Sequence, residues 1–276
     1  MTTPLSIDRI EQARRASTLG RQLVVFASTG STNNIAWEYA ANPANHGLCV
    51  LAERQTAGRG RRGRSWVGGD SQSILCSILL VEPPMEAELL TLTAAVAVAD
   101  AVRSFCGLNA QVKWPNDVLV NGKKLAGILV EKRIVGGRVC FVVGIGINCN
   151  QTAEAFEGLD LRTPATSIHI ETGMQADRTG LVCMLLETLE QWLVCSSSFS
   201  LVKKEHAKAC TTNNPVIERW MQLSTLLGRH ITVESDNRLY SGYCRGVDPT
   251  EGLIVQLESG AVRAFCAQRT SILRSE

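Results

Sequence analysis

VLVNGKKLAGILVE, residues 118–131, is the stretch that decides the predicted fold. Its two apolar runs flank Asn121-Gly122, a pair typical of a type I′ turn because both residues tolerate positive φ. The pattern therefore predicts a β-hairpin. Gly136-Gly137 predicts a second tight turn, and Val139–Ile147 a third strand, so this region forms an antiparallel meander.

On either side of this meander, the sequence predicts further strands and several helices. Short apolar runs indicate strands at Leu23–Phe26, Leu48–Ala52 and Ile74–Val81. Helical patterns indicate a first helix over Ser6–Leu19 capped by Ser6, an alanine-rich core helix over Met85–Phe105, and a helix over Asp177–Trp192 that resumes toward Lys208 after a break at the serines. The predicted class is α+β, with a mixed, largely antiparallel sheet.

The character of the chain changes at Gly228. Short strand-like runs then alternate with turn residues such as Asp236-Asn237, Asp248-Pro249 and Ser259-Gly260. This spacing is typical of a small β-barrel of about fifty residues. We therefore predict two domains, a catalytic domain over residues 1–227 and a barrel over residues 228–276.

Composition narrows the function classes. The 276 residues are 45% hydrophobic and 20% charged, with a net charge of +2, which argues against a broad nucleic-acid-binding face. Ten cysteines form no C-x-x-C pair, and four histidines are scattered, so we expect reduced thiols and no metal site. The first twenty residues lack a secretory signal, and no apolar run approaches a membrane span, so a cytoplasmic protein is expected.

GRGRRGR, residues 58–64, is the most distinctive polar segment. Glycine lets the backbone wrap closely, and arginine matches phosphate or carboxylate, so the loop should grip an anion and be mobile without one. A solvated charge run and a nucleic-acid patch are the alternatives. A dinucleotide fingerprint would need a helix after the glycines, but the strand-like run Ser73–Leu80 follows, and no Gly-Lys-Ser/Thr completes a P-loop.

Other polar residues point to a small-molecule site. Ser28–Asn34 is a dense polar turn before a helix over Ile35–Ala41, and its hydroxyls could cap that helix, line a polar site, or do both. Trp66 could cover a base or anchor the loop. Lys113 and Lys124 lie on neighbouring predicted strands, and no Ser-His-acid or Cys-His arrangement stands out. Adenylation, which depends on positioning and on positive charge facing the phosphates, fits these residues.

Several motifs together resemble one known family. GRGRRGR with Trp66, KWPND at 113–117, KLAGILVE at 124–131, GIGIN at 144–148 and ATSI at 165–168 occur in the order and spacing of the biotin protein ligases, the biotin–[acetyl-CoA-carboxylase] ligases. The resemblance spans roughly Val24 to the C-terminus and implies an SH3-like C-terminal barrel. It implies that biotin and MgATP give biotinyl-5′-AMP, which then acylates a lysine of a biotin carboxyl carrier domain.

The resemblance also implies a set of site residues. Those that hold the ureido ring of biotin are Ser31, Thr32, Asn33 and Gln55. Those of the loop over biotin and the adenylate phosphate are Gly58, Arg59, Gly60, Arg61, Arg64 and Trp66. Those on the nucleotide side are Lys113, Asn116 and Asp117. Gly127 and Gly146 admit the ligand, and Asn148 is a further ligand-binding residue. The expected catalytic residues are Lys124, beside the reacting carboxylate and phosphate, with Arg61, Lys113 and Asp117.

Two rival functions remain at this point. Lipoate protein ligases share the catalytic fold, although the arginine loop and the barrel favour biotin. A nucleic-acid-binding module using the arginine loop is the rival from another class. Too few residues precede Val24 for the winged helix-turn-helix of repressor-type members, so we expect a monofunctional form without DNA or membrane partners. The oligomeric state and the particular carboxylase acceptor stay open.

Overall fold

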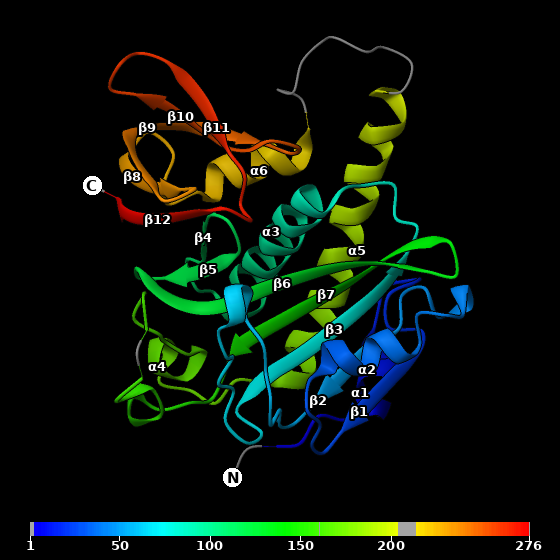
Figure 1. The fold of residues 1–276 in the computed structure, drawn as a ribbon. Coiled ribbons are helices and arrows are strands. Elements are labelled where there is room, and N and C mark those ends of the chain that lie inside the picture. Colours follow the sequence, from blue (N-terminus) through cyan, green and yellow to red (C-terminus); the bar gives the residue numbers. More distant parts are fainter. Residues whose placement is uncertain (1–2, 160, 204–213, 276) are drawn as a thin grey trace.

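The computed structural model describes residues 3–159, 161–203 and 214–275. Its larger sheet has seven strands in the order β1-β2-β3-β7-β6-β5-β4 (Figure 1). Only β1 and β2 pair in parallel, and the other neighbours are antiparallel, which confirms the α+β class. The strands are β1 Leu23–Phe26, β2 Cys49–Ala52, β3 Ser73–Val81, β4 Gln111–Lys113, β5 Asp117–Val120, β6 Lys123–Val135 and β7 Arg138–Asn148.

The predicted meander is confirmed. Asn121 and Gly122 have φ of 49° and 75°, as a type I′ turn requires, and they join β5 to β6. Gly136 and Gly137 also have positive φ and join β6 to β7. The strand β6 continues four residues beyond the predicted end at Glu131, because Lys132–Val135 still pair with β7.

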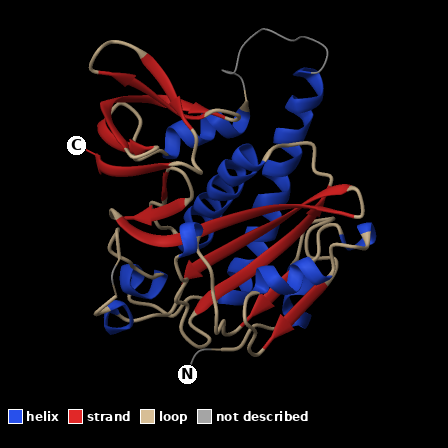
Figure 2. Cartoon of the chain, in the orientation of Figure 1, coloured by secondary structure: helices blue, strands red, loops and turns tan. Residues whose placement is uncertain are grey.

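Helices pack against one face of this sheet (Figures 1 and 2). They are α3 Ala87–Cys106, α5 Arg178–Lys203 and α6 Pro215–Leu223. The predicted break at the serines is wrong, because α5 runs through Ser196–Ser198 without interruption. The predicted resumption toward Lys208 lies outside the described residues. The sequence analysis did not identify α6, which begins with Asn214 accepting a hydrogen bond from the Val216 amide at 2.9 Å.

The helix α3 requires one correction. By length and composition it could cross a membrane, contrary to the statement that no apolar run approaches a membrane span. However, 67% of its apolar window is buried inside the protein. Its alanine-rich sequence lets α5 and the sheet approach closely, so α3 is the central core helix of this fold.

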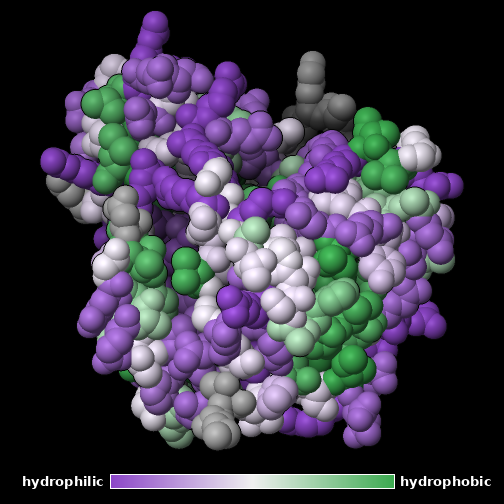
Figure 3. All heavy atoms as spheres, turned by 60° about the horizontal axis from the view of Figure 1, so that its bottom comes forward, coloured by the Kyte–Doolittle hydropathy of each residue, from purple (hydrophilic) through white to green (hydrophobic). Residues whose placement is uncertain are grey.

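The opposite face of the sheet carries a smaller apolar cluster beneath α2, Thr32–Glu38. Because α2 is only two turns long, it covers this face incompletely. Val24, Phe26, Ile35 and Val135 pack at the cluster while remaining partly exposed. Figure 3 shows the largest hydrophobic patch at the lower right of the face that it draws, with smaller hydrophobic patches elsewhere among hydrophilic residues.

The first helix is shorter than predicted. Ser6 caps it as expected, accepting from the Arg9 amide at 3.3 Å, but α1 spans only Ile7–Ala13. The amides of residues 17–19 do not continue a helix, because they donate to the carboxylate of Glu190 on α5; those of Thr18 and Leu19 lie 2.6 and 3.2 Å from Glu190 Oε1. A tertiary contact therefore replaces the last helical turns.

This contact predicts a pH dependence of stability. Burial acts to raise the pKa of Glu190, but hydrogen bonds from the amides of residues 17–19 outweigh it and hold the pKa below the usual value. A depressed pKa stabilises the fold above the unfolded-state pKa of about 4.3, and this stabilisation is lost as the pH falls through the folded-state pKa. We expect Glu190→Gln to reduce the loss of unfolding free energy on acidification below that value. Urea titrations at several pH values measure it, and an unchanged pH slope would contradict the prediction.

The C-terminal residues form a second, five-stranded antiparallel sheet with the order β11-β10-β9-β8-β12. Its strands are β8 His230–Ser235, β9 Arg238–Asp248, β10 Gly252–Leu257, β11 Val262–Phe265 and β12 Thr270–Ser275. The sequence analysis missed β12, which has no apolar alternation. Apolar residues of this sheet, such as Ile231 and Val255, share one core cluster with α3. The division at residues 227 and 228 stays a prediction.

Candidate active site

The register of the larger sheet aligns two glycines at the centre of one face. Asp117 on β5, Gly127 on β6, Gly146 on β7 and Leu75 on β3 lie opposite one another in consecutive strands. Residues paired across strands point to the same face, so Gly127 and Gly146 leave a trough without side chains. This face carries the polar residues that the sequence analysis singled out.

The indole of Trp66 lies in this trough. A Cβ built on Gly146 would come within 2.3 Å of Trp66 Cε2, and one on Gly127 within 3.0 Å of Trp66 Cζ3. The indole nitrogen is buried without a hydrogen-bond partner. Thus Trp66 anchors the far end of the arginine loop here, and the close approach that the two glycines permit is, in this structure, an approach by Trp66.

The polar turn at the start of α2 forms a connected network of uncharged groups. Gln55 Oε1 accepts from the amide of Thr32 at 2.8 Å and from its hydroxyl at 3.0 Å. Ser77 on β3 donates to the Thr32 hydroxyl at 2.7 Å. Ser31 occupies the N-cap position but makes no side-chain capping bond. The capping interpretation therefore does not hold for Ser31, whose side chain lines the cavity described below.

Asn33 is held from two sides. Its Oδ1 lies 2.6 Å from the Ser77 hydroxyl, and its Nδ2 donates to Glu131 at 3.1 Å. Gly144 makes room for it, because a Cβ there would lie 2.4 Å from Asn33 Oδ1. Glu131 also pairs with Arg59 of the loop at 2.9 Å, so the polar turn and the arginine loop are joined through one carboxylate.

The two lysines of the predicted site have different partners. Lys124 Nζ lies 2.7 Å from Asp117 Oδ1 and 5.6 Å from the ring centroid of Trp66. Lys113 Nζ donates to the Thr163 hydroxyl at 3.1 Å. Lys124 therefore stands over the glycine trough, whereas Lys113 lies at the segment that follows β7.

The arginine loop contacts both sheets. Arg61 donates to Asn116 Oδ1 at 3.1 Å and to the carbonyl of Ala267, while Arg62 donates to Gln268 O at 3.2 Å and to the Ser271 hydroxyl. Burial, together with the neighbouring Arg62 charge, lowers the pKa of Arg61 from its usual value. Four arginines of the loop, Arg59, Arg61, Arg62 and Arg64, thus line one cavity and bring positive charge to it, which favours an anionic ligand.

These elements enclose a cavity of about 650 Å³. It is lined by every predicted site residue except Gly58, which packs instead against the backbone of Trp66. Part of the wall was not predicted, including Ser65, Leu75, Leu129, Gly144, Phe156, Leu159, Leu161, Arg162, Thr163 and the β12 residues Thr270–Leu273. Gly144 was detectable, because its alternation with Gly146 places both glycines on one face.

The lining residues suit a ligand that has both a neutral polar ring and a pair of anionic groups. Hydroxyls and amides from α2 and Gln55 can satisfy donors and acceptors without charge. Lys124 and Arg61 line the same cavity, and Asp117 is the only carboxylate among its described lining residues. No cluster of three or more His, Cys, Asp or Glu side chains forms within residues 3–159, 161–203 and 214–275.

Comparison with known proteins places these features in a family. Residues 25–148 match the Biotin/lipoate A/B protein ligase family. The chain is 31% identical over 267 residues to the bifunctional ligase/repressor BirA of Bacillus subtilis, covering 95% of this chain and 78% of that protein. It is also 31% identical to the biotin–[acetyl-CoA-carboxylase] ligase of Paracoccus denitrificans, covering 86% and 95%. Biotin protein ligase from Aquifex aeolicus in complex with biotin and ATP has the same fold, with a TM-score of 0.72 at 24% identity, covering 93% of this chain and 100% of that one.

Proposed function

Because this chain belongs to the Biotin/lipoate A/B protein ligase family, and its relatives include a biotin–[acetyl-CoA-carboxylase] ligase, we propose that it attaches biotin to a carrier protein at the expense of ATP. The reaction passes through biotinyl-5′-AMP, and the acceptor is a lysine on the biotin carrier domain of a carboxylase. The observation that carries the proposal is the cavity, which an uncharged polar network and the two cations Lys124 and Arg61 line together.

In the first step, the biotin carboxylate attacks the α-phosphorus of ATP, a new O–P bond forms, and pyrophosphate leaves. Both reactants are anionic, so bringing them together requires compensating positive charge. Lys124 and Arg61 supply this charge from opposite sides, the sheet and the loop. Thr32, Asn33 and Gln55 hold the ureido ring in position, because their side chains already form a hydrogen-bonded network in the protein, and Ser31 lines the cavity beside them.

In the second step, the neutral ε-amine of the acceptor lysine attacks the acyl carbon of the mixed anhydride. A C–N bond forms, the bond to the phosphate oxygen breaks, AMP leaves, and the amine loses a proton. Asp117, at the mouth of the hairpin and paired with Lys124, is the carboxylate available to take it. Trp66, over the glycine trough, is placed to cover the nucleotide base or to restrict access by water.

We include Mg²⁺ as an ion that arrives with ATP. Mg²⁺ is usually bound through one or two carboxylates together with substrate phosphates, so it does not require a cage of protein ligands. Among the described lining residues, Asp117 alone offers such a carboxylate. When bound, the ion would supply positive charge to the phosphates.

Biotin-dependent exchange of pyrophosphate into ATP tests the first step. We expect the purified protein to catalyse this exchange with biotin and not with lipoate, and to transfer labelled biotin to a carboxylase carrier domain. Exchange that depends on lipoate alone would support the other branch of the family. Salt-sensitive retention of DNA or RNA without any exchange would favour the nucleic-acid-binding function.

We further predict that ligands order the arginine loop. The segment Thr56–Gly69 should be cleaved readily by trypsin in the free protein and be protected by biotin plus ATP, because the adenylate neutralises its arginines and seals a reactive anhydride from water. Mass spectrometry of the fragments measures cleavage at each arginine. Equal cleavage with and without both ligands would contradict this prediction.

The cellular setting is also part of the proposal. The nine cysteines in the described part of the chain are free thiols, and most are buried, as expected in a reducing compartment. We therefore assign the enzyme to the cytoplasm, with a carboxylase carrier domain as its protein partner and with neither DNA nor membrane.

A further inference from the structure

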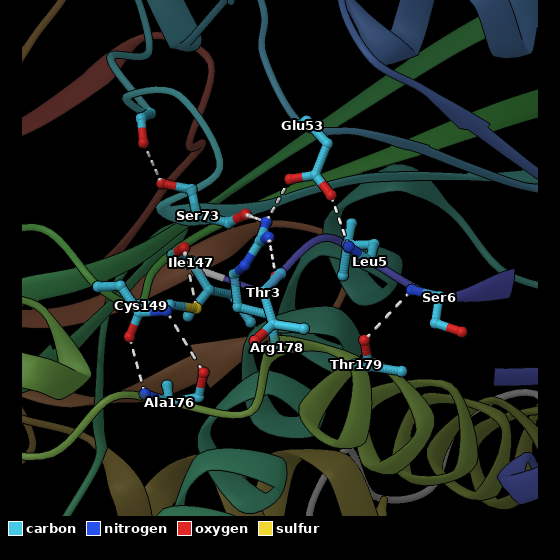
Figure 4. Close-up of polar contacts among 12 residues, drawn as sticks. Thr3, Leu5, Ser6, Glu53, Ser73, Ile147, Cys149, Ala176, Arg178 and Thr179 are labelled. Atoms are coloured by element: carbon cyan, nitrogen blue, oxygen red, sulfur yellow. Dashed lines mark hydrogen bonds and ion pairs between the residues drawn. The ribbon is translucent and has the colours of Figure 1, made fainter. Parts of the chain in front are cut away.

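The first residue of α5 carries a buried charge that the reaction does not use. The side chain of Arg178 is 1% exposed, and its guanidinium donates to three acceptors (Figure 4). These are Glu53 Oε2 at 2.7 Å, the carbonyl of Ser73 at 3.1 Å and the carbonyl of Thr3 at 2.7 Å. One side chain therefore connects three segments that are far apart in the sequence.

Two of these segments are the ends of the arginine loop. Glu53 directly follows β2, and Ser73 begins β3. The connection between them, residues 54–72, contains the arginine loop. The Ser71 amide donates to the carbonyl of Glu53 at 3.0 Å, and the Ser73 hydroxyl donates to Gly68 O at 2.6 Å. We call Glu53 and Ser71–Ser73 the loop neck. Arg178 donates hydrogen bonds to both sides of this neck, to Glu53 on one side and to Ser73 on the other.

The third segment is the N-terminal segment, Thr3–Ser6. Besides the contact of Thr3 with Arg178, the Leu5 amide donates to Glu53 Oε1 at 2.6 Å and the Ser6 amide to the Thr179 hydroxyl at 3.4 Å. All three contacts use main-chain groups of the N-terminal segment. Because every residue type carries these groups, no sequence motif predicts the contacts. The segment does not line the cavity, yet it binds the same carboxylate that closes the loop neck.

Arg178 and Glu53 form a buried ion pair in which both side chains are charged. Burial acts to raise the pKa of Glu53, but hydrogen bonds from Arg178 and from the Leu5 amide outweigh it and hold the pKa below its usual value. Glu53 is therefore charged at neutral pH. Removing either partner would leave the other as an uncompensated buried charge. We therefore expect the contacts of Arg178 and Glu53 with the loop neck and the N-terminal segment to be lost together.

We propose that Arg178 and Glu53 are positioning residues, which set the loop neck so that the arginine loop closes over the cavity and which couple that closure to the N-terminal segment. The proposal rests on the proposed function, because biotin and ATP are the ligands that close the loop. Coupling of this kind is reciprocal, so ligands in the cavity must also stabilise the N-terminal segment.

Hydrogen exchange of the full chain tests the coupling. Biotin plus ATP should slow exchange in peptides that cover the loop and in the peptide that covers Thr3–Ser6. In Glu53→Gln, the slowing at Thr3–Ser6 should disappear, and the loop should exchange faster than in the unaltered protein. The matched control is Arg219→Lys, because Arg219 pairs with Asp100 at 2.6 Å between α6 and α3, away from the loop. It should lower the melting temperature without changing either response.

Kinetics provide the second readout. Glu53→Gln should raise KM for biotin in pyrophosphate exchange by about tenfold and shorten the retention of biotinyl-AMP to a similar extent, with a smaller change in kcat. Arg178→Lys, which keeps the charge but cannot reach all three acceptors, should lie between Glu53→Gln and the unaltered protein. It also serves as the test variant if Glu53→Gln does not fold.

Two results would overturn the proposal. One is loop protection by ligands in the unaltered protein with no change at Thr3–Ser6. The other is a variant that loses thermal stability like the Arg219→Lys control while loop exchange and KM stay unchanged, which would make the pair purely structural. If the unaltered protein shows no biotin-dependent exchange, the proposed function fails. Coupling is then decided without ligand, by whether Glu53→Gln speeds exchange in both peptides.

Discussion

Replacing Lys124 by alanine is expected to lower biotin-dependent ATP–pyrophosphate exchange by about 10²–10³-fold, the loss typical of one charge-stabilising group in a confined site. Lys124 stands over the glycine trough, 2.7 Å from Asp117 and 5.6 Å from the centre of the Trp66 ring. Its charge is needed where the biotin carboxylate meets the α-phosphate. The effect should fall on kcat more than on KM for biotin, because the charge matters most as the two anions approach.

Two controls separate this role from the ion pair with Asp117. Lys123→Ala removes the neighbouring lysine, which is exposed and does not line the cavity, and should leave exchange unchanged. If Lys124 only neutralised Asp117, the double variant with Asp117→Asn would recover activity, and we expect no recovery. Near-normal pyrophosphate release from purified Lys124→Ala would refute the catalytic role.

Gly146→Ala is expected to lower the same exchange rate by about 10²-fold, the loss typical of a misplacement of about 1 Å in a catalytic site. Gly146 lies in a regular strand, so alanine meets no backbone strain there. However, its Cβ would lie 2.3 Å from Trp66 Cε2 and 2.5 Å from Cζ2, which is closer than atoms can approach. The indole must leave the trough and shift the far end of the arginine loop with it.

The matched control is Gly30→Ala, because a Cβ at Gly30 meets nothing within 4 Å and the residue does not line the cavity. We expect wild-type exchange from this variant. Gly146→Ala should keep a near-normal melting temperature while its loop becomes easier to cleave with trypsin. Full activity of Gly146→Ala would show that Trp66 need not occupy the trough during catalysis.

The turn residues of the sequence were sufficient to predict the β5–β6–β7 meander at the centre of the larger sheet. Asn121-Gly122 and Gly136-Gly137 can take the positive φ that tight hairpins require, so the meander followed from the turns themselves. Its period-two alternation places Gly144 and Gly146 on one face, although only Gly146 was predicted as a site residue. The resemblance to the biotin protein ligases rested on motifs in these same segments, and the comparisons confirmed the family.

The boundaries of elements that depend on residues distant in the sequence were predicted less well. The helix α1 ends early because Glu190 binds the amides of residues 17–19, and α5 continues through Ser196–Ser198 although serine has a weak helix propensity. The strand β12 was missed because pairing with β8 forms it rather than a hydrophobic pattern of its own.

The sequence by itself determined the turns and alternating strands of the meander, because turn geometry and strand alternation are local properties. Its motifs, through the family resemblance, indicated the residues expected to bind biotin and ATP. Only the tertiary structure decided that Trp66 fills the trough, that β12 and the segment around Phe156–Thr163 complete the cavity, and that Arg178 ties the N-terminal segment to the loop neck. Those contacts join residues tens to hundreds of positions apart, and several of them use main-chain groups, which leave no signature in the side chains.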